Sequence, residues 1–289
     1  MSSPRKPSWL IKSFPSSGKS HALKKRLREL RLHTVCESAS CPNIHECFSR
    51  STATFMILGD VCTRACGFCG VNKGAPLPVD REEPHRVARM AGELRLKHVV
   101  ITSVTRDDLP DGGASHYADT ISMLRQRTQA TIEILVPDFF PETCLRPDVF
   151  NHNIETVPRL YPAVRPSSDY NRSLDLLKRA KERNPALITK SGIMLGLGES
   201  HEEVIEALKD LRAAGCDVAT IGQYLQPGKS QRPVAAYVPP ERFEEYREIG
   251  EGMGFLHVAS GPFVRSSFNA GVIFLKRTKK NPGVSSQNK

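Results

Sequence analysis

Six of the eight cysteines in this chain gather in two triplets that could hold metal. The triplets are Cys36, Cys41 and Cys47, spaced C-x4-C-x5-C, and Cys62, Cys66 and Cys69, spaced C-x3-C-x2-C. A closed structural zinc site uses four ligands, so each triplet is one ligand short. Compact sets of thiolates are typical of iron–sulfur sites. A cluster held by three cysteines leaves one iron open, and an open metal position is where chemistry occurs.

Other interpretations of these cysteines stay open at this point. They could form a zinc module, or remain free thiols in a reducing compartment. They could hold clusters that only carry electrons, although a simple carrier would use fully ligated clusters and needs no chain of 289 residues. The net charge of +10 together with the cysteines also suggests a zinc-stabilised nucleic-acid-binding protein. We find no zinc-finger, helix-turn-helix or RNA-binding aromatic motif that would support it.

The second triplet, with Phe68 before its last cysteine, resembles the signature of radical S-adenosylmethionine (SAM) enzymes. The first triplet, within TVCESASCPNIHEC, resembles the auxiliary-cluster motif of the lipoyl synthase family. The two motifs together are far more specific than either one alone. The resemblance runs from about Lys6 to about Ala270, which is nearly the whole chain.

The resemblance implies a reaction. A [4Fe–4S] cluster on the second triplet would bind SAM and cleave it with one electron, and the resulting radical would remove hydrogen from an alkyl carbon. A second [4Fe–4S] cluster on the first triplet would donate sulfur to carbons 6 and 8 of an octanoyl chain attached to a lysine of a carrier protein. The alternatives are another sulfur-inserting radical SAM enzyme or an iron–sulfur electron carrier.

Near the C-terminus, Arg265-Ser266-Ser267 resembles the RSSY motif of the same family, with Phe268 in place of tyrosine. The resemblance implies that Ser266 is the fourth ligand of the auxiliary cluster. A serine oxygen is a poorer iron ligand than a thiolate, so this bond would be the weak one. A second departure is Gln231, at a position where the family often has histidine.

Strands and helices are expected to alternate along the middle of the chain. Strands are predicted at 53–58, 98–103, 131–137, 149–153, 187–195 and 217–222, and helices at 81–96, 115–127, 169–182 and 200–215. Such alternation favours parallel βαβ units. Six units are too few for a closed eight-stranded barrel, so we predict an α/β fold with a partial (β/α)6 barrel of the TIM type, as the resemblance also implies.

In a parallel barrel the functional residues lie where the strands end. Polar residues follow every predicted strand, and we select Ser103, Asn153 and Glu155 as candidates for binding SAM, on position alone. Phe68 is a further candidate because it lies inside the second cysteine motif.

Three regions are expected. Residues 1–50 form an N-terminal extension with the first cysteine motif, residues 51–235 form the barrel, and residues 236–289 form a C-terminal extension with the RSS motif and a disordered basic tail. A helix from Ser20 carries leucines on one face and Lys24, Lys25 and Arg28 on the other. The basic face is either a docking surface or, more simply, a solvated side of a packed helix.

Composition limits the partners. No apolar run approaches the roughly 20 residues needed to cross a bilayer, and the cysteine spacing does not resemble a secreted disulfide framework. We therefore expect a cytoplasmic monomer that binds neither membrane nor nucleic acid. The resemblance implies three kinds of partner: acidic octanoylated lipoyl-domain proteins, a reducing electron donor, and iron–sulfur assembly proteins that rebuild the auxiliary cluster.

Overall fold

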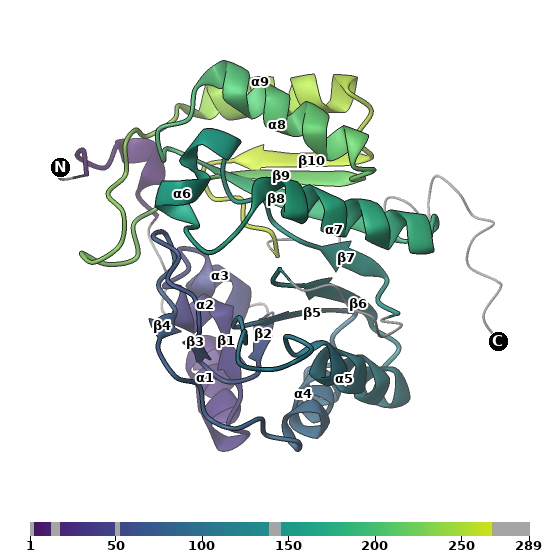
Figure 1. The fold of residues 1–289 in the computed structure, drawn as a ribbon. Helices are drawn as coiled ribbons and strands as arrows, with labels where there is room; N and C mark the ends of the chain where they lie inside the picture. Colours follow the sequence, from purple (N-terminus) through teal and green to yellow (C-terminus); the bar gives the residue numbers. More distant parts are fainter. Residues whose placement is uncertain (1–2, 13–17, 50–52, 139–145, 268–289) are drawn as a thin grey trace.

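The computed structural model describes residues 3–12, 18–49, 53–138 and 146–267, and one sheet organises them (Figure 1). The sheet has eight strands in the order β1-β2-β5-β6-β7-β8-β9-β10. Their bounds are β1 His33–Thr34, β2 Thr54–Ile57, β5 His98–Ser103, β6 Thr131–Leu135, β7 Val149–Asn151, β8 Ile188–Leu195, β9 Val218–Gln223 and β10 His257–Gly261.

Neighbouring strands are parallel from β2 to β10, and only the edge pair of β1 and β2 is antiparallel. The six predicted strands correspond to β2, β5, β6, β7, β8 and β9, which confirms the α/β class with a mostly parallel sheet. The sheet also continues beyond them, because β10 pairs in register with β9. Strand β10 therefore adds a seventh parallel strand from the region expected to be a C-terminal extension.

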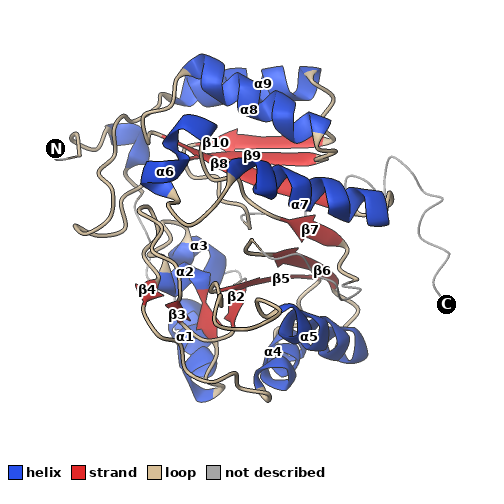
Figure 2. Ribbon diagram, viewed as in Figure 1, coloured by secondary structure: helices blue, strands red, loops and turns tan. Residues whose placement is uncertain are grey.

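Long helices connect the strands along the outer side of the sheet, as Figure 2 shows. They are α4 Glu83–Glu93, α5 Ala114–Arg127, α7 Tyr170–Arg183, α8 His201–Ala213 and α9 Pro240–Gly252. A capping box begins α8, close to the start of the helix predicted at 200–215: Ser200 accepts from the Glu203 N–H, and Glu203 accepts from the Ser200 N–H. None of the helices in the described ranges is long and apolar enough to span a bilayer.

Short elements at the N-terminal side carry the cysteines. Helix α1 Gly18–Glu29 turns Leu23 and Leu27 into the core, as its leucine periodicity predicts. Helices α2 Val35–Ser38 and α3 Ile44–Ser49 follow, and β3 Val61–Cys62 pairs with β4 Asn72–Lys73 around the second cysteine motif. The remaining elements are η1 Ser8–Leu10, η2 Pro158–Leu160 and α6 Tyr161–Val164.

Buried polar side chains link the sheet to the end of the described chain. Lys190 on β8 and Glu133 on β6 are each 1% exposed and form an ion pair of 2.9 Å. Asn151 Nδ2 donates to Glu133 Oε1 at 2.9 Å, and Lys190 Nζ also donates to the backbone carbonyl of Ser266. A buried charge pair needs such additional hydrogen bonds, and here one of them fixes the segment that follows β10.

Candidate functional site

The second triplet begins with Cys62, the last residue of β3, and continues in the loop that joins β3 to β4. Cys62 Sγ accepts hydrogen bonds from the backbone N–H of Arg64 at 3.4 Å and of Thr105 at 3.3 Å. Hydrogen bonds to sulfur are one of the means by which proteins tune thiolate-bound clusters. This donor set therefore suits a thiolate that ligates a cluster.

Two clamps fix this loop on the sheet. Arg64, between the first two cysteines, pairs with Asp107 at 2.8 Å and with the buried carboxylate of Asp138. Gly67 donates to Val164 O at 2.9 Å and accepts from the Arg232 N–H at 2.8 Å. A Cβ at Gly67 would lie 3.3 Å from a carbonyl oxygen, so glycine permits this close approach. Phe68 is partly buried against the core.

Asn153 and Glu155, two predicted site residues, are in contact. Asn153 Nδ2 donates to Glu155 Oε1 at 3.0 Å. Glu155 has a positive φ of 66°, which is uncommon for a residue with a side chain. Burial raises the pKa of Glu155, and Arg165 opposes this shift. Glu155 also interacts electrostatically with the thiols of Cys66 and Cys69, so it faces the second triplet.

Ser103 ends β5 and pairs with Ile57 of β2 in the sheet. Its hydroxyl is buried and interacts with the hydroxyl of Tyr117 on α5. Nothing in the described ranges links Ser103 directly to Asn153 or Glu155, so the structure joins two of these three candidates.

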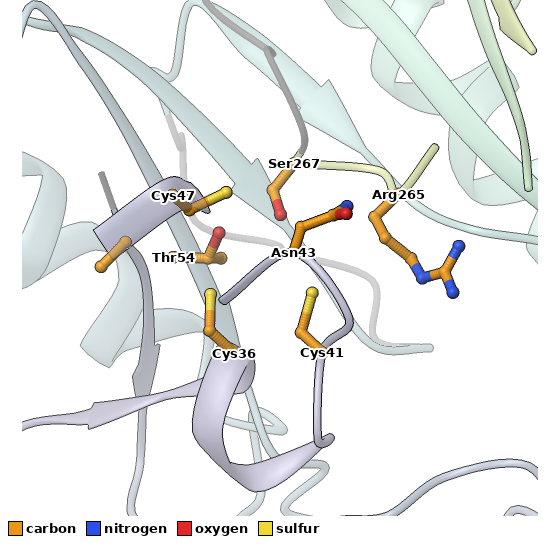
Figure 3. A pocket seen from close by; sticks show the side chains of 8 residues that line it. Cys36, Cys41, Asn43, Cys47, Thr54, Arg265 and Ser267 are labelled. Atoms are coloured by element: carbon orange, nitrogen blue, oxygen red, sulfur yellow. The ribbon is translucent and has the colours of Figure 1, made fainter. Parts of the chain in front are cut away.

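The first triplet lines a small pocket that is partly open to solvent (Figure 3). The sulfur atoms of Cys36 and Cys41 point the same way in Figure 3, toward the part of the pocket that holds Cys47 and Ser267. Among the described residues, no three His, Cys, Asp or Glu side chains are placed so that they could hold a single metal ion. The lining residues are Cys36, Cys41, Asn43, Cys47, Ala53, Thr54, Arg265 and Ser267.

Three chain segments build the wall of this pocket. Asn43 Nδ2 donates to Phe263 O at 2.7 Å, and Lys12 Nζ donates to Asn43 Oδ1 at 2.8 Å. The Arg265 guanidinium donates a hydrogen bond of 2.6 Å to the backbone carbonyl of the preceding residue, Val264. It also interacts electrostatically with Cys41. Burial raises the pKa of the Cys36 thiol to about 12. The pocket thus combines soft ligands with a partly buried cation.

The two serines of the RSS motif point to different places. Ser266 Oγ donates to Asn153 Oδ1 at 3.0 Å, whereas Ser267 lines the cysteine pocket. This placement differs from the expectation that Ser266 would face the pocket. The bonds from Lys190 to the Ser266 carbonyl and from the Ser266 hydroxyl to Asn153 turn Ser266 toward the sheet. Phe268, Cys144 and the basic tail lie outside the described residues.

Sequence reasoning missed several charged residues that support the site. Arg165 is buried and donates to Asn153 O at 3.1 Å and to Tyr161 Oη at 3.1 Å. Arg64 and Arg265 each lie inside a motif, but the motifs indicate only the cysteine and serine ligands and give no role to the arginines. The only feature of the sequence that could have indicated Asp138 is its position directly after a predicted strand.

Comparison with known proteins identifies the family. A model of the radical SAM superfamily matches residues 56–211, and a model of the N-terminal domain of lipoyl synthase of the radical SAM family matches residues 1–41. The lipoyl synthase of Caldanaerobacter subterraneus subsp. tengcongensis is 58% identical over 275 residues, which cover 93% of this chain and 96% of that protein. The lipoyl synthase of Aeromonas salmonicida is 54% identical over 92% of this chain and 85% of that protein.

Solved structures support the fold. The crystal structure of Streptococcus suis SuiB bound to S-adenosylmethionine matches with a TM-score of 0.53 and 12% identity, over 73% of this chain and 50% of that one. The parallel sheet, the three-cysteine loop and the superfamily match define a radical SAM enzyme, a class that implies one [4Fe–4S] cluster and SAM as cofactors. Within that class the chain belongs to the lipoyl synthase family. The zinc-module and electron-carrier alternatives are thereby set aside.

Proposed function

We propose that this enzyme inserts sulfur at carbons 6 and 8 of a protein-bound octanoyl-lysine, with the first cysteine triplet holding the cluster that donates the sulfur. The observation that carries the proposal is the presence of two separate three-cysteine sites in one fold, one in a clamped loop and one lining a pocket. One site generates the radical, and the other stores sulfur within the same protein.

At the radical site, Cys62, Cys66 and Cys69 hold the first [4Fe–4S] cluster. A reduced cluster with SAM supplies a carbon-centred radical able to remove hydrogen from an unreactive alkyl carbon. The chain's own residues bind and orient the cofactor. We propose Glu155 and Ser103 as residues that bind SAM, because Glu155 faces the second triplet and Ser103 ends the neighbouring strand β5. Phe68, within the cluster loop, packs against the hydrophobic core.

At the auxiliary site, Cys36, Cys41 and Cys47 hold a second [4Fe–4S] cluster, and a serine of the RSS motif is the fourth ligand. We assign that role to Ser267 in place of Ser266, because the Ser267 side chain lines the cysteine pocket and the Ser266 hydroxyl is bonded to Asn153. A hard oxygen ligand is a poor match beside three soft thiolates. The serine would therefore be the weakest of the four ligands of a bound cluster, and Arg265 would offset part of the negative charge of that cluster.

The proposal includes the three regions expected from the sequence. Residues 1–50 supply the auxiliary cysteines, residues 51–235 bind the first cluster and SAM, and residues 236–289 supply the serine ligand. The pairing of β10 with β9 attaches the third region to the sheet of the barrel. The hydrogen bond from Asn43 to Phe263 O joins the first and third regions at the auxiliary site.

The proposed partners are octanoylated lipoyl-domain proteins, a reducing electron donor and iron–sulfur assembly proteins. A carrier domain rich in carboxylates would suit the net charge of +10. We place the reaction in the cytoplasm and the enzyme as a monomer. The cysteines of the described ranges form no disulfide, which is consistent with a reducing compartment.

A single-turnover assay tests the proposed function. Protein loaded anaerobically with both clusters is mixed with dithionite, SAM and an octanoyl-lysyl peptide, and mass spectrometry follows the peptide and 5′-deoxyadenosine. The expected result is a gain of two sulfur atoms in the wild type. A Cys36→Ala variant should form 5′-deoxyadenosine without sulfur on the peptide. Formation of 5′-deoxyadenosine without sulfur insertion by the wild type would exclude the octanoyl substrate, and its absence would exclude the radical reaction.

A further inference from the structure

The side chain of Asn153 lies between the two cysteine sites, and the nitrogen and the oxygen of its amide group each form a hydrogen bond. Nδ2 donates to Glu155 Oε1 and Oδ1 accepts from Ser266 Oγ, each at 3.0 Å. A carboxylate only accepts hydrogen bonds, so the amide nitrogen must face Glu155 and the oxygen must face the serine. The buried Arg165 guanidinium also holds the Asn153 backbone carbonyl at 3.1 Å. The orientation of this amide is therefore determined by its neighbours.

The Glu155 end of this contact belongs to the radical site. Glu155 interacts electrostatically with Cys66 and Cys69, and its backbone is fixed to β8 by bonds of 2.9 Å to Gly192 O and from Met194 N. Within the described part of the chain, Oε1 has a donor in Asn153 and Oε2 has none. A carboxylate oxygen can accept from a ligand at Oε2 without releasing Asn153 at Oε1.

The Ser266 end belongs to the auxiliary site. The next residue, Ser267, lines the cysteine pocket, and Lys190 holds the Ser266 carbonyl. Gly192 lies beneath the contact: a Cβ there would come within 2.8 Å of Asn153 Oδ1 and 2.9 Å of Ser266 Oγ. The pair thus packs directly on the backbone of β8, where only glycine leaves room for it.

We infer that Asn153 is a positioning residue that couples the two sites, so that SAM bound beside Glu155 holds Ser267 more firmly at the auxiliary pocket. A donor from SAM to Glu155 Oε2 restricts the carboxylate, the carboxylate then orients Asn153, and Asn153 restrains Ser266. Coupling between two sites is reciprocal, so the Ser266 contact also strengthens the binding of SAM. The inference rests on the proposed function, since it assumes SAM and the auxiliary cluster at these positions.

The affinity for SAM measures one direction of the coupling. Equilibrium dialysis is done on the full chain loaded with both clusters, without reductant, so that SAM is not cleaved. Ser266→Ala is expected to weaken binding about fivefold, at the lower end of usual coupling energies. Ser260→Ala is the matched control, because that hydroxyl on β10 bonds to Phe243 O at 2.6 Å, away from Asn153. In an Asn153→Ala background, Ser266→Ala should have no further effect.

Hydrogen–deuterium exchange measures the other direction. SAM is expected to slow amide exchange in residues 262–267 in the wild type and in Ser260→Ala, and to leave it unchanged in Ser266→Ala and Asn153→Ala. Protection confined to the 62–69 loop, with equal affinity of wild type and Ser266→Ala, would overturn the coupling while leaving the proposed function standing. Failure of the loaded protein to bind SAM at all would overturn the proposed function itself, and the coupling with it.

Discussion

The ammonium group of Lys190 donates to the backbone carbonyl of Ser266 and lies 2.9 Å from Glu133 Oε1. One buried cation thus connects two strands of the sheet with the segment that closes the auxiliary pocket. The ion pair carries a high cost of desolvation, which its hydrogen bonds offset. Its position suggests that it keeps the serine pair in place.

Removing one member of this pair should be more harmful than removing both. Lys190→Met leaves a buried carboxylate without its cation and should lower the free energy of unfolding by about 3–5 kcal/mol. The double variant Lys190→Met/Glu133→Gln should lose less, because the glutamine still accepts from Asn151. Urea unfolding gives the comparison, and a larger loss in the double variant would contradict the charge argument.

The same pair predicts acid sensitivity. Burial alone would raise the pKa of Glu133, but Lys190 and His98 lower it to about 2. A carboxyl group with a lowered pKa in the folded state stabilises the protein above its ordinary pKa and loses that contribution as the pH falls. The shift corresponds to about 3 kcal/mol, lost between about pH 5 and pH 2. Cluster-free wild type should show this loss in urea unfolding, and Lys190→Met/Glu133→Gln should show a shallower pH dependence.

The fold was largely predictable because its signals are local. Alternation of apolar runs with amphipathic helices located β5 at its observed bounds, and the helix predicted from residue 200 begins at the N-cap of α8. The pairing of β10 with β9 was not predictable in this way. Strand β10 follows a long connection and helix α9, and strand pairing across such a distance has no local pattern.

The site was predictable only as far as its motifs reach. The cysteine spacing indicated two triplets, but no spacing tells which of two adjacent serines faces a pocket. That choice depends on Lys190 and Asn153, which lie 76 and 113 residues away from Ser266 in the sequence. Arg165 was missed for the same reason, since its partner Asp138 approaches it only in the folded chain.

The serine assignment gives a direct spectroscopic prediction. With iron-57 in both clusters, Ser267→Ala should change the Mössbauer spectrum of the auxiliary cluster, because one iron loses its oxygen ligand. Ser266→Ala should leave that iron ligated, since its hydroxyl bonds to Asn153. A cluster signal altered by Ser266→Ala and unaffected by Ser267→Ala would reverse the assignment.

Arg265 should tune the potential of the auxiliary cluster. Its guanidinium is a partly buried positive charge that interacts electrostatically with Cys41, and a nearby cation favours the form of the cluster with one more electron. Arg265→Met should lower the midpoint potential by on the order of 50 mV, close to a tenfold change for one electron. Arg265→Lys keeps the charge and should shift the potential less. Redox titration followed by electron paramagnetic resonance measures the midpoint potential in both variants. An unchanged potential in Arg265→Met would show that the charge of Arg265 has no effect on the cluster.

The basic side of α1 should contribute to carrier binding if the acidic lipoyl domain docks there. Lys25 and Arg28 are exposed, whereas Leu23 and Leu27 on the other side are buried. Reversing Lys24, Lys25 and Arg28 to glutamate should weaken binding of an octanoylated carrier by roughly tenfold at low salt, mainly through a slower association rate. The matched control reverses three exposed cations of α7, namely Lys178, Arg179 and Arg183. Equal weakening by both sets, measured by surface plasmon resonance, would attribute the effect to net charge alone. No weakening by the α1 set would leave this helix as a packed element with a solvated basic side.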